Sequence, residues 1–339
     1  MNTFDTSTLA KWKTQQGFNL IELMISVTIG SFLILAAAYA FQQAKNSYLI
    51  NENVARLQEQ AQFVLDGLDE DLRHANFWGK HNSVNAMTIG ATITGAINND
   101  CNDPADTSFN GWALNIPQGI HGTNNIYPPW GTGCITAADF VANTDSLVIR
   151  HADTAEVADA DLEAGKIYIS SLETPLGVVF KGTTPPLSTG TEAKTFEMVS
   201  HGYYVRDWAY TANDNIPMLR RITLVDGGAE PSVADNEFAV GVEDLQIEFG
   251  IDTSSLGSPG RGSINRYVAP DNAVLNNPGV TIRSVRVWLL MRSQFPEQNY
   301  TNTTTYAYGD KNGLSAYTPD DAFRRLLVSR TYQIRNMEI

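Results

Sequence analysis

The sequence predicts an α+β fold in which one long N-terminal helix packs on a mainly antiparallel β-sheet with long loops. Two observations predict this arrangement. A helical pattern without proline runs from about residue 18 to residue 76, and strand-like segments separated by turn-rich stretches follow from residue 146 onward. With 339 residues the chain can hold one large or two small domains, and its hydrophobic content of 43% suits a globular body.

The first part of the predicted helix is an apolar run without charge from Leu23 to Phe41. About 19 helical residues rise about 28 Å, which matches the ~30 Å hydrocarbon core of a bilayer. We therefore expect residues 18–41 to form a transmembrane segment. Glu22 at its edge is anomalous, because an ionisable group at membrane depth costs roughly 2.5–3.5 kcal/mol even on the mild insertion scale and usually has a partner.

Two other interpretations of this segment stay open. In the first, residues 18–41 are a signal anchor, Gly17 is an ordinary residue before it, and the Glu22 side chain extends to the lipid headgroups. Residues 38–40, Ala-Tyr-Ala, have the small-x-small form of a secretory cleavage site, and cutting there would release a soluble protein. The apolar stretch is long for a signal peptide, however, and the helical pattern continues through this site.

Residues 42–76 continue the helix as an amphipathic segment. Apolar residues recur at steps of three and four from Val54 to Ala75, which predicts one apolar stripe that packs against a globular head, residues 77–339. Gly67 weakens this helix by about 1 kcal/mol relative to Ala. Asp69 and Arg73 stand four residues apart, the spacing of an ion pair on a helix surface.

The head begins with a polar, loop-like stretch, residues 82–144, and continues with strand-like segments. The clearest alternation of apolar and polar residues lies between Val285 and Arg292. The predicted strands cover residues 146–150, 166–170, 178–181, 198–210, 219–225, 238–249, 285–292 and 326–334.

Charge and cysteine content indicate the compartment and the partners. The net charge is −14, which does not favour nucleic acid as the main partner. Lys11 and Lys13 on the short N-terminal side favour a cytoplasmic N-terminus and a head across the membrane. In that oxidising compartment we expect Cys101 and Cys134 to form a disulfide, worth on the order of 3–4 kcal/mol in the loop-entropy model. Two unrelated buried thiols are the alternative.

The residue types that carry catalysis form no recognisable set in the sequence. The five histidines lack metal-ligand spacing, and neither a nucleophile elbow nor a phosphate-binding loop occurs. We therefore expect no enzyme activity, no cofactor and no metal site. An acidic run at residues 153–163 is compatible with calcium binding, although a solvated turn is favoured. Arginines gather after residue 280, which indicates either a docking face or, as we favour, solvated strand faces.

The N-terminal residues resemble those of type IV prepilins, in which a polar leader ends in Gly and is followed by Phe and, four residues later, by Glu. Here these are Gly17, Phe18 and Glu22. The resemblance implies that residues 1–17 are a leader peptide, that a prepilin peptidase cuts after Gly17, and that Phe18 is N-methylated. It further implies that Glu22 faces the N-terminal ammonium of a neighbouring subunit. Such a pairing would remove two desolvation penalties at once.

Several later segments resemble the PilW family of minor pilins. They are the helix at residues 54–73, the strands at 145–150 and 242–247, and the closing strand at 325–337. The resemblance implies a type IV pilin-like fold and a minor pilin that helps prime pilus assembly in a tip complex, with downstream roles in twitching motility, adhesion or DNA uptake.

The same resemblance implies partners and a location. The partners would be other minor pilins, the major pilin, the prepilin peptidase and the inner-membrane assembly platform, with a tip adhesin as a further candidate. The location would be the inner membrane, with the head in the periplasm, and later the pilus tip. A J-type minor pseudopilin of a type II secretion system is the first alternative. A membrane-anchored or released periplasmic enzyme or binding protein is the second.

Overall fold

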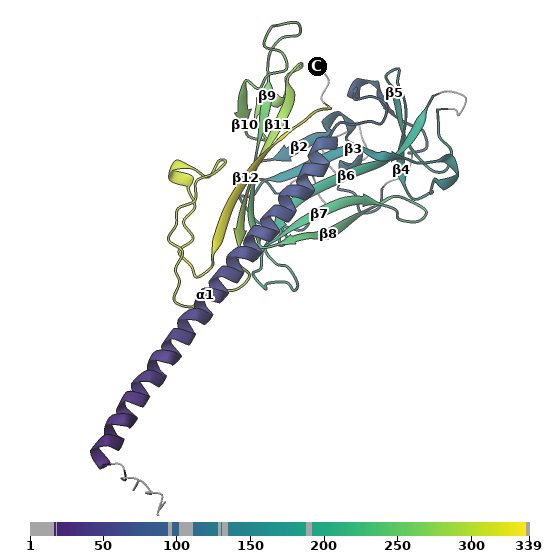
Figure 1. The fold of residues 1–339 in the computed structure, drawn as a ribbon. Helices are drawn as coiled ribbons and strands as arrows, with labels where there is room; N and C mark the ends of the chain where they lie inside the picture. The colour runs from purple at the N-terminus through teal and green to yellow at the C-terminus, as the bar shows by residue number, and fades with distance from the viewer. Residues whose placement is uncertain are drawn as a thin grey trace, which may run out of the picture. The chain divides into compact units, whose positions relative to one another are not determined.

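The computed structural model describes residues 17, 19–93, 97–101, 111–127, 130, 135–187 and 192–336. It has one long helix, α1 (Leu20–His74), followed by a domain rich in β-strands (Figure 1). This confirms the predicted α+β fold. The chain divides into two compact units, residues 1–52 and 53–339. We call residues 20–52 of α1 the stem, and the described residues from 53 onward the head.

Helix α1 ends where the sequence pattern predicts. The Phe77 amide donates to the His74 carbonyl at 2.8 Å, and Asn76 has a φ of +61°. A left-handed residue of this kind commonly follows a helix C-terminus, and asparagine tolerates it better than most residues. The chain therefore leaves the helix through a tight turn before the first strands.

Twelve strands lie in the described part of the head. They are β1 (Met87–Ile89), β2 (Ile120–Thr123), β3 (Ser146–Glu156), β4 (Ile167–Leu172), β5 (Leu176–Lys181), β6 (Lys194–Arg206), β7 (Met218–Val225), β8 (Ser232–Val240), β9 (Val242–Asp252), β10 (Arg266–Val268), β11 (Thr281–Arg292) and β12 (Arg325–Gln333). Short 3₁₀ helices connect some of them: η1 (Val84–Ala86), η2 (Trp112–Leu114), η3 (Ile116–Gln118), η4 (Asp159–Asp161), η5 (Ala273–Asn276) and η6 (Gly313–Ser315).

These strands form two sheets. In the first sheet the order is β1-β5-β4-β6-β3-β2, and β7 and β8 continue from the second half of β6. The second sheet has the order β10-β9-β11-β12. Among the described strands the pairing is antiparallel except between β1 and β5.

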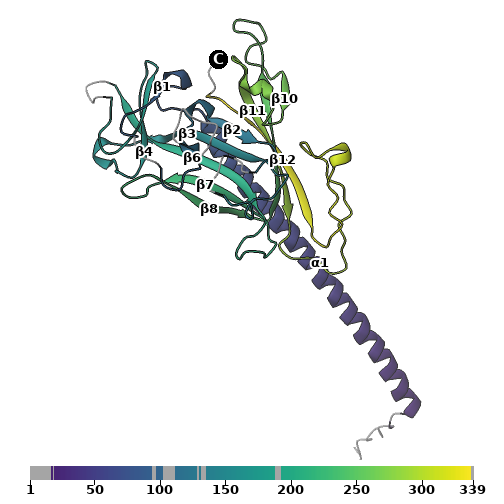
Figure 2. The same cartoon turned by 180° about the vertical axis from the view of Figure 1, so that it is seen from behind.

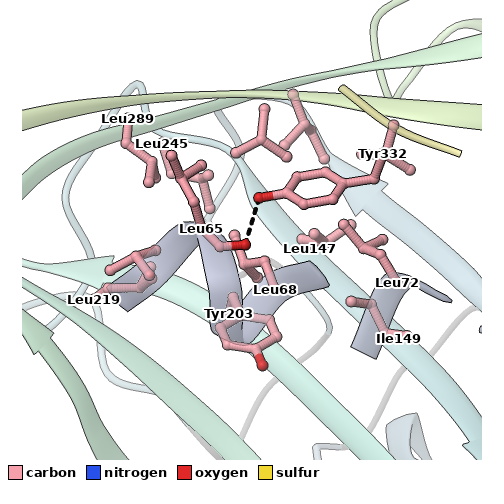
Figure 3. Packing of buried hydrophobic residues seen from close by; sticks show 14 of the residues in the cluster. Leu65, Leu68, Leu72, Leu147, Ile149, Tyr203, Leu219, Leu245, Leu289 and Tyr332 are labelled. Atoms are coloured by element: carbon pink, nitrogen blue, oxygen red, sulfur yellow. Dashed lines mark hydrogen bonds between the residues drawn. The ribbon is translucent and has the colours of Figure 1, made fainter. Parts of the chain in front are cut away.

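The apolar stripe of α1 within the head packs between the two sheets (Figures 1 and 2). Figure 3 shows Leu65, Leu68 and Leu72 between side chains of both sheets. The first sheet supplies Leu147, Ile149, Tyr203 and Leu219, and the second supplies Leu245, Leu289 and Tyr332. The Tyr332 hydroxyl also donates to the Leu65 carbonyl at 2.7 Å. The predicted packing of this stripe on a sheet is thus confirmed, with sheets on two sides of the helix.

A second core covers the opposite face of the first sheet. Trp78, Trp112 and Trp130 pack there against strand residues such as Val148 and Tyr204. Residues 82–144, predicted only as a polar loop, supply much of this core and contain β1, β2 and three 3₁₀ helices. The periodicity did not reveal them because each element has only three or four residues.

One predicted strand corresponds to two strands of the structure. Residues 238–249 form the end of β8 in the first sheet and most of β9 in the second, with a turn between them. Gly241 has a φ of +86° there, a conformation that glycine adopts without steric cost. The apolar residues on both sides of Gly241 form a continuous run in the sequence, and this hid the turn.

Candidate assembly site on helix α1

The residues predicted to direct assembly lie at the start of α1. Gly17 is exposed and precedes the helix, and Glu22 is exposed in its first turn. A carboxylate in that position is favoured by the unpaired amide groups at the helix N-terminus. Phe18, the predicted methylation site, lies outside the described residues. The cleavage, methylation and pairing roles of Gly17, Phe18 and Glu22 stay predictions.

An apolar surface surrounds the stem. Large hydrophobic side chains point outward along its length, with exposures such as 76% for Leu20, 73% for Phe32 and 71% for Ile34. A window of 18 residues has a mean hydropathy of 2.2 and none of it is buried. By length and composition this helix can cross a membrane.

The polar side chains within this surface are satisfied inside the helix. The Ser26 hydroxyl donates to the Glu22 carbonyl at 2.7 Å, and the Thr28 and Ser31 hydroxyls donate to carbonyls three or four residues earlier. Such bonds remove the cost of placing a hydroxyl in an apolar medium. Between residues 20 and 44 of the described stem, Glu22 is the only charged side chain, and the next one is Lys45. An apolar environment would therefore leave the Glu22 carboxylate without a compensating charge.

In the head, two of the histidines that look scattered in the sequence, His151 and His201, lie next to Asp71 of α1. His201 Nδ1 lies 2.7 Å from Asp71 Oδ2, and the Tyr203 hydroxyl donates to the same oxygen at 2.5 Å. His151 Nε2 lies 4.0 Å from Asp71 Oδ1. Burial alone would raise the pKa of the Asp71 carboxyl, but the bonds from His201 and Tyr203 outweigh it and lower that pKa. Burial lowers the pKa of His151.

This cluster joins the last turns of α1 to β3 and β6, and its geometry indicates a structural role. No group of three or more metal-ligating residues has a suitable arrangement among the described residues. Sequence reasoning missed the cluster because its members are up to about 130 residues apart. One signal was present, however. Asp71 is three residues after Leu68 and next to Leu72, so it occupies a position on the buried face of the helix.

Most of the arginines after residue 280 pair with carboxylates. Arg325, whose side chain is fully buried, bonds Glu243 at 2.8 Å and Asp321 at 2.6 Å. Arg330 on β12 bonds Asp66 of α1 at 2.8 Å. The expected solvated strand faces are therefore wrong for Arg325, and much of the local basic charge holds the head together.

The remaining sequence predictions have mixed outcomes. Asp69 and Arg73 pair at 2.7 Å as their spacing predicts. The acidic run ends β3 and forms η4, and the side chains of Glu156, Asp159 and Asp161 are exposed. Cys101 is fully buried, whereas Cys134 lies outside the described residues, so their disulfide stays a prediction.

A long N-terminal apolar helix followed by a mostly antiparallel domain is consistent with a pilin-like fold. Two family models match the chain: the Prokaryotic N-terminal methylation motif over residues 12–38, and the Type IV Pilus-assembly protein W over residues 202–336. Together these matches are those of a PilW-family minor pilin. No curated protein and no solved structure matches the chain significantly.

The two matches support a broad function. They are those of a structural component of the type IV pilus, and the methylation motif together with the apolar helix indicates a pilin anchored in a membrane. The match over residues 202–336 covers β7 to β12 and most of the packing partners of α1 in the second sheet. The methylation motif covers Gly17, Phe18 and Glu22.

Proposed function

We propose that this minor pilin helps prime type IV pilus assembly, in a tip complex with other minor pilins. The observation that carries the proposal is the exposed apolar surface of the stem with the Glu22 carboxylate at its start. A monomer with this surface needs either lipid or other subunits around it. The same stem would therefore hold the subunit in the inner membrane and later enter the filament.

In this mechanism the peptidase removes residues 1–17 and the new amino group of Phe18 becomes methylated. The Glu22 carboxylate then pairs with the ammonium of a neighbouring subunit and sets its axial register. Pairing in an apolar medium is strong because both charges are otherwise unsolvated. Twitching motility, adhesion or DNA uptake would follow from the completed fibre, with the head in the periplasm before assembly.

The substitution Glu22→Ala tests this proposal. We expect the variant to be cleaved and inserted normally but to enter sheared pili at least ~10-fold less than the wild type, because an unpaired ammonium would cost more than ~1.4 kcal/mol. The measurement is the amount of the subunit in sheared fibres relative to membranes, by quantitative immunoblotting.

Glu59→Ala is the matched control. Glu59 is an exposed glutamate on the same helix, outside the apolar run, and its loss should leave incorporation unchanged. Normal incorporation of Glu22→Ala would sink the pairing role. Deletion of the whole subunit separates the two assembly systems: loss of surface fibres supports the pilus, and loss of exoprotein secretion with intact fibres supports a pseudopilin.

A further inference from the structure

The head contains a groove of about 700 Å³ next to strand β2, which we call the β2 groove. One wall is β2 with the residues just before it, and the other wall is the segment 270–282 with η5 and the start of β11. Phe249 of β9 also lines it. The volume lies within the range of natural ligand sites, roughly 300–1,000 Å³.

Strand β2 is an open edge of the first sheet along this groove. Among the described strands it pairs only with β3. The Arg150 amide donates to the Gly119 carbonyl at 2.7 Å, so Gly119 faces β3 with its backbone groups. In an antiparallel ladder every second residue does so, and the next ones on β2 are His121 and Thr123. Ile120 and Gly122 therefore direct their N–H and C=O groups away from β3. Among the described residues, no backbone hydrogen bond is formed by these outward-facing N–H and C=O groups.

The walls combine apolar side chains with neutral polar ones. Among the polar side chains amides predominate, for example Asn82, Asn85, Gln118, Asn272 and Asn276. Two charged side chains, Arg261 and Asp271, also line the groove, and both are engaged within the head. Arg261 donates to the Gly279 carbonyl at 2.7 Å, and Asp271 accepts from Asn124 at 3.2 Å.

We propose that the β2 groove binds an extended, uncharged segment of a partner polypeptide, which adds to the first sheet as a strand beside β2. The open groups on Ile120 and Gly122 recur at every second residue, about 6.8 Å apart along a strand, as do the matching groups of an extended peptide. The wall amides can both donate to and accept from its backbone and polar side chains. This binding site belongs to the head alone and goes beyond the assembly role of the stem.

Hydrogen exchange of the full chain in detergent micelles, resolved to single amides by mass spectrometry, tests the proposal. The probe is the neutral peptide acetyl-Val-Asn-Val-Asn-Val-amide at millimolar concentration. We expect exchange at the Ile120 and Gly122 amides to slow by at least ~10-fold, because they become hydrogen-bonded. The amides of His121 and Thr123, already bonded to β3, should change little.

Two variants at neighbouring exposed positions make the test specific. Asn276→Trp would fill the groove and should abolish the slowing, whereas Asn277→Trp, beside it but outside the lining, should preserve it. Slowing in both variants, or no slowing in the wild type, would overturn the proposal. Slowing by chitotetraose but not by the peptide would overturn it in favour of a glycan site. None of these outcomes depends on whether Glu22 directs filament assembly.

Discussion

Single buried polar residues join the elements of the head. Asp71 fixes α1 to the first sheet through His201 and Tyr203, and Asp145 fixes the first sheet to the second. Asp145 directly precedes β3, and its Oδ2 accepts a hydrogen bond from the Ile247 amide of β9 at 2.8 Å. Neither partner was predictable, because a sequence pattern shows which residues are buried but not which distant strand they meet.

The Asp145 carboxyl has an unusual protonation state. It is 1% exposed, and burial is the main reason that its pKa is raised to about 8. The nearby carboxylates of Asp310 and Asp244 raise it further, and the bonds from Ile247 and Asn125 oppose the change. Because the unfolded-state pKa is about 3.9, the folded head binds an additional proton between about pH 4 and pH 8. The free energy of unfolding should therefore fall as the pH rises through this window.

Asp145→Asn should reduce this pH dependence. We expect the wild type to lose on the order of 1 kcal/mol of unfolding free energy per pH unit between pH 5 and pH 8 through this group, and the variant to lose less. The asparagine would be less stable at pH 5, since its amide cannot accept both backbone bonds. Urea unfolding of the full chain in detergent, followed by tryptophan fluorescence, measures both effects.

Asp214→Asn is the control for this experiment. Asp214 is a partly exposed aspartate whose pKa is about 2; its slight burial would raise the pKa, but bonds from four backbone amides lower it. Its stabilising contribution is complete above pH 4 and is lost only as the pH falls toward 2. Its removal should leave the slope between pH 5 and pH 8 unchanged. An Asp145→Asn variant with the slope of the wild type would contradict our assignment of the proton.

Secondary structure was predictable where the elements are long. The period of α1 and the alternation in β11 extend over enough residues for the buried face to be evident, and both elements form as predicted. The three-residue strands β1 and β10 lack such a pattern. They exist because tertiary pairing provides partners, β5 for β1 and β9 for β10.

Gly67 shows why a residue that weakens an isolated helix is present in this one. A Cβ atom at Gly67 would lie 2.7 Å from Cζ of Phe238 on β8. The Phe238 ring is itself held by Phe63 and Tyr203, at ring-centroid distances of 5.5 Å and 5.2 Å. Gly67 therefore allows α1 to approach β8 closely, and this offsets its poor helix propensity.

Gly67→Leu should destabilise the head by about 1–3 kcal/mol, because the Phe238 ring would have to leave its contacts with Phe63 and Tyr203 to make room. The double variant Gly67→Leu/Phe238→Ala should show a positive coupling, since the alanine makes room for the leucine. Urea midpoints of the two single variants and the double variant give the coupling energy. Purely additive effects would mean that the contact does not limit the approach of the helix.

At the scale of the whole molecule, the sequence predicted the order of the parts better than their packing. The apolar stripe indicated that α1 covers a sheet, and the structure has sheets on two sides of it together with a separate core beneath residues 82–144. Three tryptophans of that second core, Trp78, Trp112 and Trp130, lie among polar and turn-forming residues. Their burial depends on the strand face that they cover, which no local pattern reports.

The mature protein should begin at Phe18 with a methylated amino group. The exposed apolar stem and the match to the methylation motif both support retention of residues 18–41 after the leader is removed. Intact mass spectrometry of the protein purified from its native membrane measures this start directly. Alkylation without a reductant adds a second reading: the proposed bond between Cys101 and Cys134 would leave no thiol to modify.

Gly17→Ala is the variant for comparison, because a Cβ at the cleavage position hinders close approach of the peptidase to the backbone. We expect the variant to accumulate with residues 1–17 attached and to be missing from sheared fibres, while its head retains the wild-type urea midpoint. A wild-type mass that includes the leader would contradict the processing step. A mass that begins at Phe41 would show that the chain is released by cleavage after residues 38–40, and a protein without its stem has no means of joining the filament core.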